Sequence, residues 1–332
     1  MLCVTTTIVE AVAGAQVRRA VDASLELPLI DGTREAVPRA AIASALAALL
    51  FHDLVQRVPE GREYVTDQVK AGRKICFDHG AIRTVDGPSG ELPGGDAAFA
   101  RILEPLGYVR TGVYPLERLK MTGRVFTHAD LPEEIAQFFV SELHVRRFSA
   151  PFQAAAAAVL RSSRDPLNAG AVTLLERLRR EKVLPMEQVV QLVPWLLRAF
   201  GRQHEEPALS DYEVLLQESA EMAWIATEGN AFNHATDRVD DIHAVAAEQR
   251  RLGRTIKPSV EVSRSGRVLQ TAFLASPVRR RFFTPDGYVD REVPGSFYEF
   301  IQRERNPRGR LDLSFDSANA TGIFKMTAAE GT

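Results

Sequence analysis

The sequence contains only two cysteines, Cys3 and Cys76, among its 332 residues. Two cysteines cannot build a disulfide framework, and they are too few for a structural zinc site made of thiolates. A chain that depends on neither is suited to a reducing compartment, so we expect this protein to work in the cytoplasm.

The sequence also lacks a strong excess of charge and a long apolar run. Its 41 lysines and arginines nearly balance 43 aspartates and glutamates, and the formal net charge of −2 gives no electrostatic case for a nucleic-acid or membrane partner. The most apolar stretch, residues 40–51, is too short to span a bilayer and predicts a buried helix. No basic region followed by a long apolar run stands near the N-terminus, so we expect no signal peptide.

One short motif is present in two copies. Each copy reads phenylalanine, aspartate or asparagine, histidine, a small residue, two variable residues and arginine, at residues 77–83 and 232–238. Side chains alternate between the two faces of a strand. Two regular strands would therefore each place four side chains on one face: Phe77, His79, Ala81 and Arg83 in the first copy, and Phe232, His234, Thr236 and Arg238 in the second. Two histidines on equivalent strands are what a metal site shared between two modules needs.

Each copy of the motif begins a similar series of predicted elements. Turn residues, β-branched residues and apolar periodicity predict the order strand, helix, strand, strand, strand after both copies. In the first module, strands are predicted at 74–85, 108–116, 119–128 and 138–145, with a helix at 96–106. In the second module, strands are predicted at 229–239, 259–263, 268–275 and 295–302, with a helix at 240–252. We therefore expect an α+β fold in which two βαβββ modules enclose one metal.

The two modules divide the chain into four predicted segments within one compact domain. An N-terminal helical segment covers residues 1–73, and the first module covers 74–148. The stretch 149–228 carries apolar residues at helical spacing throughout, and it predicts a helical insertion between the modules. The second module and a C-terminal tail cover residues 229–332.

The last predicted strand carries a carboxylate in apolar surroundings. Glu299 is flanked by Tyr298 and Phe300, which we expect to face away from it and into the core. A buried carboxylate is costly unless it is paired or binds a metal. Almost the same number of residues separates His234 from Glu299 as separates His79 from Glu142. Each module thus has a histidine on its first strand and a glutamate near its fourth.

Two histidines and one carboxylate form the ligand set of the non-haem Fe(II) oxygenases, in which vacant positions take O₂ and a chelating substrate. We assign His79, His234 and Glu299 to this set, although the same ligand types also accept Zn, Ni, Mn or Co. Arg83 lies two pleats from His79 and is a candidate for catalysis and for binding a substrate carboxylate with its planar fork. Glu142 or His144 could supply a fourth ligand, and a supporting or core role is the alternative.

Three short stretches resemble one known family. Residues 78–83, 233–234 and 295–300 are similar to the motifs of the 2-oxoadipate dioxygenase/decarboxylase family, also called 2-hydroxyglutarate synthases. That family is related to the vicinal oxygen chelate superfamily of glyoxalases and extradiol dioxygenases. The resemblance extends from about residue 38 to the end. It implies metal ligands at His79, His234 and Glu299, a substrate-binding arginine at Arg83, and conversion of 2-oxoadipate to 2-hydroxyglutarate by Fe(II) and O₂ with loss of CO₂.

The first hypothesis is therefore an Fe(II) dioxygenase whose partners are a small 2-oxo acid and O₂. The second is a glyoxalase-like isomerase or lyase that uses Zn²⁺ or Ni²⁺ as a Lewis acid, with a fourth protein ligand such as Glu142. The third is a non-catalytic protein that binds a small molecule in the same pocket. Uptake of O₂ in the presence of 2-oxo acids distinguishes the first hypothesis from the other two.

Overall fold

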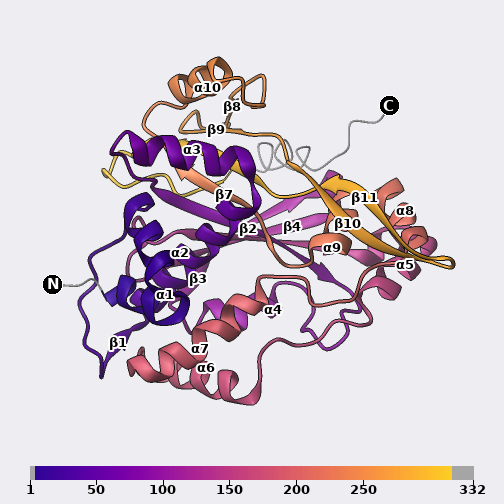
Figure 1. Cartoon of the computed structure of the whole chain (residues 1–332), viewed down its shortest axis with the longest axis horizontal. Helices are drawn as coiled ribbons and strands as arrows, with labels where there is room; N and C mark the ends of the chain where they lie inside the picture. Colours follow the sequence, from indigo (N-terminus) through magenta and orange to yellow (C-terminus); the bar gives the residue numbers. More distant parts are fainter. Residues whose placement is uncertain (1–3, 316–332) are drawn as a thin grey trace.

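A mixed eight-stranded sheet runs through the middle of the molecule in the computed structural model, which describes residues 4–315 (Figure 1). The order of its strands is β3-β4-β5-β2-β7-β12-β9-β8. The predicted α+β class is thereby confirmed. Cys3 and the tail beyond residue 315 lie outside the described residues.

The first module forms one half of this sheet, in the predicted order. Its elements are β2 (Phe77–Asp86), α4 (Ala97–Leu103), β3 (Tyr108–Leu116), η1 (Glu117–Leu119), β4 (Met121–His128), β5 (Gln137–His144) and η2 (Val145–Arg147). β2 pairs with β5 in parallel, while β5 with β4 and β4 with β3 are antiparallel. The fourth strand, predicted at 138–145, is thus present and lies beside the first.

The second module repeats this topology. Its elements are β7 (Phe232–Arg238), α10 (Ile242–Arg251), β8 (Glu261–Val262), β9 (Val268–Ala272) and β12 (Phe297–Arg303). β7 pairs with β12 in parallel, and β12 with β9 and β9 with β8 are antiparallel. β2 and β7 pair antiparallel and join the two halves into one sheet.

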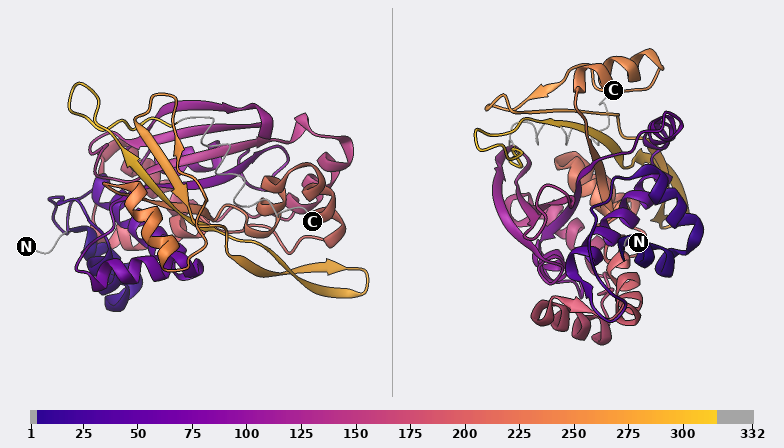
Figure 2. Two further views of the ribbon diagram at one scale, coloured as in Figure 1. Left: turned by 90° about the horizontal axis from the view of Figure 1, so that it is seen from above. Right: turned by 90° about the vertical axis from the view of Figure 1, so that its left-hand side faces the viewer.

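A hairpin interrupts the second module between β9 and β12. Its strands, β10 (Pro277–Thr284) and β11 (Gly287–Pro294), pair with each other as a separate two-stranded sheet, and Phe283 of β10 also forms an isolated bridge with Ala208. The turn contains Gly287 at a φ of 120°, a conformation that glycine adopts without strain. The β10–β11 hairpin extends away from the body of the molecule (Figure 2).

The helices of the two helical segments pack in two separate groups. The N-terminal segment forms α1 (Val4–Ser24), α2 (Arg39–Arg57) and α3 (Pro59–Lys70). The insertion forms α5 (Ala150–Leu160), α6 (Ala169–Glu181), α7 (Met186–Ala199), α8 (Leu209–Glu218) and α9 (Ala220–Glu228). One group packs around α2 and the other around α8. The insertion is not entirely helical, because β6 (Val183–Leu184) pairs with β1 (Val37–Pro38). This pairing brings α7 beside α1 and α2 (Figure 1).

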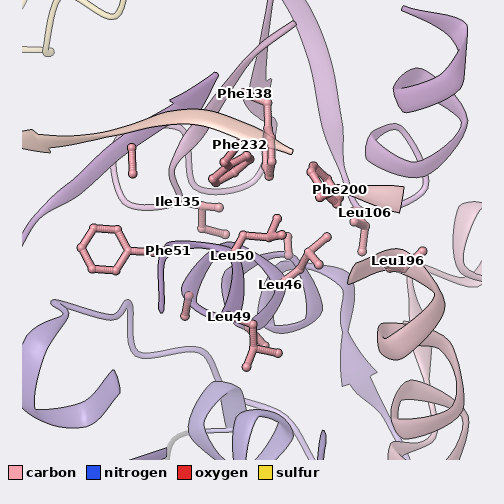
Figure 3. Packing of buried hydrophobic residues seen from close by; sticks show 14 of the residues in the cluster. Leu46, Leu49, Leu50, Phe51, Leu106, Ile135, Phe138, Leu196, Phe200 and Phe232 are labelled. Atoms are coloured by element: carbon pink, nitrogen blue, oxygen red, sulfur yellow. The ribbon is translucent and has the colours of Figure 1, made fainter. Parts of the chain in front are cut away.

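The core lies between α2 and the sheet. Leu46 and Leu50 of α2 pack beneath Phe138 and Phe232 of the sheet, and Phe200 closes the cluster from the end of α7 (Figure 3). By length and composition α2 is the one helix among residues 4–315 that could cross a membrane. All residues from 40 to 51 are buried in the protein, which confirms the predicted core helix. We call the sheet face that contacts this helix the α2 face, and the opposite one the site face.

Candidate metal centre

Each histidine motif contains a β-bulge at the residue before its histidine. In β2, Phe77 and His79 face consecutive positions of β7, so Asp78 is the extra residue. In β7, Phe232 and His234 face Ile82 and Ala81 of β2, so the residue between them is extra there too. A bulge reverses the alternation of side chains beyond it. The two copies of the motif are therefore alike in backbone as well as in sequence.

The bulges separate each phenylalanine from its histidine. The ring of Phe77 lies 5.1 Å from that of Phe51 on α2, and the ring of Phe232 lies 5.8 Å from that of Phe138, so both point to the α2 face. The prediction that phenylalanine and histidine share a face was wrong, because simple alternation does not hold across a bulge. Gly80 is required here, since a Cβ would lie 2.4 Å from the ring of Phe232.

The structure brings His79, His234 and Glu299 together on the site face. The Nε2 atoms of His79 and His234 lie 3.3 and 3.2 Å from Oε2 of Glu299. The potential ligand atoms of the three side chains all lie within 4.8 Å of one another, and all three residues are buried. They come from β2, β7 and β12, which are neighbours at the centre of the sheet. Residues that are far apart in the chain thus form one cluster of metal-binding groups.

Neighbouring side chains hold two of these three groups. Thr236 donates a hydrogen bond of 2.6 Å to Oε2 of Glu299, and Gln270 donates one of 2.9 Å to Oε1. On the other side, Nδ1 of His79 lies 2.9 Å from Oδ1 of Asp78, where it donates to the carboxylate. That leaves the Nε2 lone pair of His79 directed at the other two groups.

The electrostatics of the cluster favour a positive charge at its centre. Burial raises the pKa of Glu299, but His234 and His79 lower it by a larger amount. The pKa of Glu299 therefore lies well below its ordinary value. Burial lowers the pKa of His79, but Asp78 and Glu299 outweigh it and raise the pKa above the ordinary value. Burial lowers the pKa of His234, which keeps its imidazole neutral and able to bind a metal.

The ring nitrogens of His234 provide the test of whether a metal fits. Both are buried, and within residues 4–315 neither makes a hydrogen bond of acceptable geometry, although Nε2 lies 3.2 Å from Glu299. A buried polar group without a partner is costly, and one reason for a protein to retain such a group is that it binds a metal. Imidazole and carboxylate groups suit a divalent first-row metal, so the donor set fits such an ion.

The first module has no carboxylate at the position equivalent to Glu299. His79 pairs with Gln137 as His234 pairs with Phe297, so Phe139 is the counterpart of Glu299. Phe139 packs with Ala81 and Val125 as an apolar wall on the site face. Its ring fits there because Gly123 has no side chain: a Cβ would lie 2.3 Å from the ring.

Glu142 and His144 do not join the cluster. Alternation along β5 puts both on the α2 face with Phe138. Glu142 forms an ion pair with Arg124, and His144 contacts Thr122 and Asp86. The hypothesis of a fourth ligand from Glu142 or His144 is therefore wrong. Counting residues suggested an equivalence with Glu299 that the register does not support.

Arg83 lies on the site face, as its spacing from His79 predicts, and it is buried. Its guanidinium stacks 4.9 Å from the ring centre of Trp224 on α9. Burial lowers its pKa to about 10, and Glu221 opposes that shift, so the side chain stays charged at neutral pH. The charge is close enough to His234 to lower the pKa of that imidazole. Asp237, on the opposite face of β7, accepts a hydrogen bond from Tyr64 of α3.

Sequence reasoning missed the residues that support the cluster. The role of Asp78 could have been predicted, because Asp78 directly precedes His79 in the repeated motif. Thr236 was placed on the correct face without a role. Gln270 and Arg303 carry no local signal, because only the pairing of β12 with β9 and β7 brings them to the site.

Comparisons with known proteins point to one family. The model of the 2-oxoadipate dioxygenase/decarboxylase family matches residues 31–325. The chain is 24% identical over 289 residues to the 2-oxoadipate dioxygenase/decarboxylase, chloroplastic/amyloplastic, of Oryza sativa subsp. japonica. This alignment covers 77% of this chain and 70% of the rice protein.

Solved structures extend the comparison to the fold. A glyoxalase superfamily protein from Ralstonia eutropha JMP134 is 51% identical and superimposes with a TM-score of 0.92 over 95% of this chain and 99% of that one. The hydroxyglutarate synthase of Oryza sativa, solved in complex with 2-oxoadipate, shares the fold at 20% identity, with a TM-score of 0.67 over 92% of this chain and 98% of that one. Because the family model spans nearly the whole chain and the fold agrees, this protein belongs to the 2-oxoadipate dioxygenase/decarboxylase family.

Proposed function

We propose that the protein is an Fe(II)-dependent dioxygenase/decarboxylase that acts on 2-oxoadipate or a close 2-oxo dicarboxylic acid. Membership of the family supports the reaction class. The observation that carries the proposal is the convergence of His79, His234 and Glu299, three electron-pair donors that lie buried around one point. The overall reaction balances as 2-oxoadipate and O₂ giving 2-hydroxyglutarate and CO₂.

The chain offers three ligands to the metal. His79, His234 and Glu299 would hold Fe(II), and Phe139 stands where a symmetric site would have a fourth ligand. When bound, Fe(II) supplies the redox chemistry by which O₂ reacts with a chelated 2-oxo acid. A site with three protein ligands suits this use better than a closed site, which favours the dioxygenase over the isomerase hypothesis.

The other residues of the site bind and orient. Arg83 would hold the far carboxylate of the substrate, because its planar fork matches a carboxylate and its guanidinium is stacked on the ring of Trp224. Thr236 and Gln270 bind one oxygen each of Glu299 and so restrict the rotation of that carboxylate. Ala81 and Phe139 present an apolar surface beside the histidines, which excludes water from that side.

The test is the consumption of O₂ by the reconstituted protein. The protein is loaded with Fe(II) without oxygen, and O₂ uptake is then followed with 2-oxoadipate and with 2-oxohexanoate, which lacks the second carboxylate. We expect uptake with 2-oxoadipate, equal amounts of CO₂ and 2-hydroxyglutarate, and a much lower rate with 2-oxohexanoate. Tight binding of 2-oxo acids without O₂ uptake would instead support the non-catalytic hypothesis.

A further inference from the structure

Arg303 is a fully buried cation on the site face, at the end of β12. Its side chain has no exposed surface, and its Nε and Nη2 atoms donate to both oxygens of Asp78 at 2.8–3.0 Å. Nη1 donates 2.8 Å bonds to the backbone carbonyls of Asp312 and Ser314. Arg303 therefore links two parts of the chain, β2 at Asp78 and the segment that follows β12.

The first part contains the histidine of the first module. Asp78, the bulge residue of β2, accepts from Arg303 and from Nδ1 of His79 with the same carboxylate. Arg238 approaches the other oxygen of Asp78 at 3.7 Å, too far for a hydrogen bond. The orientation of His79 thus depends on a carboxylate that Arg303 holds from the opposite module.

The second part is the segment that follows β12. Its residue Phe315 packs edge-on against the ring of His79, with the ring centres 4.8 Å apart. The same ring lies 5.1 Å from that of Phe139 and beneath the guanidinium of Arg303. The segment is also tied by Arg267 to Asp312 and by Gln137 to the carbonyl of Leu313.

His234, the histidine of the second module, has no corresponding carboxylate and arginine beside it within residues 4–315. The bulge residue before His234 is Asn233, whose amide nitrogen is buried without a partner in the described part of the chain. The position in β5 that corresponds to Arg303 is Leu143, by the same register. His234 is instead held by packing, since its ring lies 4.7 Å from that of Phe297.

We propose that Arg303 is a positioning residue that acts on the metal site in two ways. Through Asp78 it fixes the ring of His79 with Nε2 directed at the other two ligands, and through the carbonyls of Asp312 and Ser314 it seats Phe315 against the same ring. Partners that orient a metal-binding imidazole commonly change metal affinity 10–100-fold when lost. This inference rests on the proposed metal site.

The experiment compares two variants with a matched control. Arg303→Met removes the ion pair with Asp78, whereas Asp78→Asn removes its negative charge and one of its two acceptor oxygens. Arg280→Met breaks a bidentate pair of similar geometry with Glu228 outside the cluster. Binding of Co(II) to the metal-free protein is measured by calorimetry, and hydrogen exchange is measured for the amides of residues 312–315. We expect Co(II) to bind about 10–100-fold more weakly to both Asp78→Asn and Arg303→Met. Only Arg303→Met should also accelerate exchange in 312–315, and Arg280→Met should change neither quantity.

The outcomes separate the possible errors. Wild-type affinity for Co(II) in Arg303→Met, or unchanged exchange in residues 312–315, would overturn the inference. If Arg303→Met does not fold, Arg303→Lys keeps the charge but not the fork, and the inference then requires weaker Co(II) binding by Arg303→Lys than by the wild type. If the wild-type protein itself does not bind Co(II), it is the proposed metal site that fails, irrespective of Arg303.

Discussion

The two modules have the same topology but contribute differently to the site. Each supplies one histidine from its first strand, after a bulge. The fourth strand of the second module adds Glu299, and its neighbours Thr236 and Gln270 are polar. The fourth strand of the first module has Phe139 at the same position, and the residues around it are apolar. A repeated scaffold can thus produce an asymmetric site in which one half provides more of the candidate metal ligands and the other provides an apolar surface beside them.

The largest effect is expected from removing the ligand that only the second module provides. Glu299→Ala should weaken Co(II) binding by more than about 100-fold, beyond the range typical of residues that merely orient a ligand. O₂ uptake should be lost with it. Calorimetric titration of the metal-free protein measures the first quantity and an oxygen electrode the second. Retained affinity would mean that Glu299 is only a buried carboxylate paired with the histidines.

Restoring symmetry is the second way to test the comparison. Phe139→Glu places a carboxylate at the counterpart of Glu299, next to Ala81 and within the apolar wall. We expect metal affinity to be kept or increased and O₂ uptake with 2-oxoadipate to fall by at least about tenfold, because a fourth ligand occupies a position that the substrate needs. Phe139→Leu, which keeps the wall apolar, is the control. Full activity in Phe139→Glu would show that this position does not face the metal.

A smaller and more selective effect is expected at Arg83, which the first module supplies. Arg83→Lys keeps the charge and loses the planar fork. We expect the apparent KM for 2-oxoadipate to rise about tenfold, which corresponds to the loss of one charge-assisted hydrogen bond. Iron content and activity with 2-oxohexanoate should change much less. Equal losses on both substrates would place Arg83 at the metal rather than at the far carboxylate.

The smallest effect concerns stability and a buried carboxylate that only the second module has. The residue of β2 that corresponds to Asp237 in the repeated motif is Ile82. Burial raises the pKa of Asp237 to about 7, although hydrogen bonds from Tyr64 and from the amide of Cys76 oppose this shift. The folded protein therefore holds a proton on Asp237 that the unfolded chain loses near pH 4, so stability should fall as the pH rises from about 4 to 7. Asp237→Asn should remove this component, about 2.7 kcal/mol for the two pH units between pH 5 and a pKa of about 7, from the wild-type difference in unfolding free energy between pH 5 and pH 8. Urea titrations at the two pH values measure it, and an equal pH dependence in both proteins would contradict the assignment.

The sequence predicted the parts of this comparison that depend on local pattern. The repeated motif and the alternation of elements were sufficient for the order of the strands and for bringing His79, His234 and Glu299 together. Alternation failed at Phe77, because a bulge is a property of pairing between strands and leaves no clear mark in one of them. Counting residues failed at Glu142, because the β10–β11 hairpin and the loops differ between the modules. The role of Arg303 could not be predicted from the sequence, since it depends on contacts between segments that are distant in the chain.

The paired bulges decide which face of the sheet each histidine occupies. If Asp78 or Asn233 took a ladder position of its own, as in a regular strand, the histidine that follows would share the face of its phenylalanine and turn into the aromatic layer above α2. Deletion of either residue would instead leave the histidine on the site face, because phenylalanine and histidine would then be consecutive residues that point to opposite faces. The bulge thus makes room for one additional side chain beside each histidine, and in the first module this side chain is the carboxylate that accepts from Nδ1 of His79.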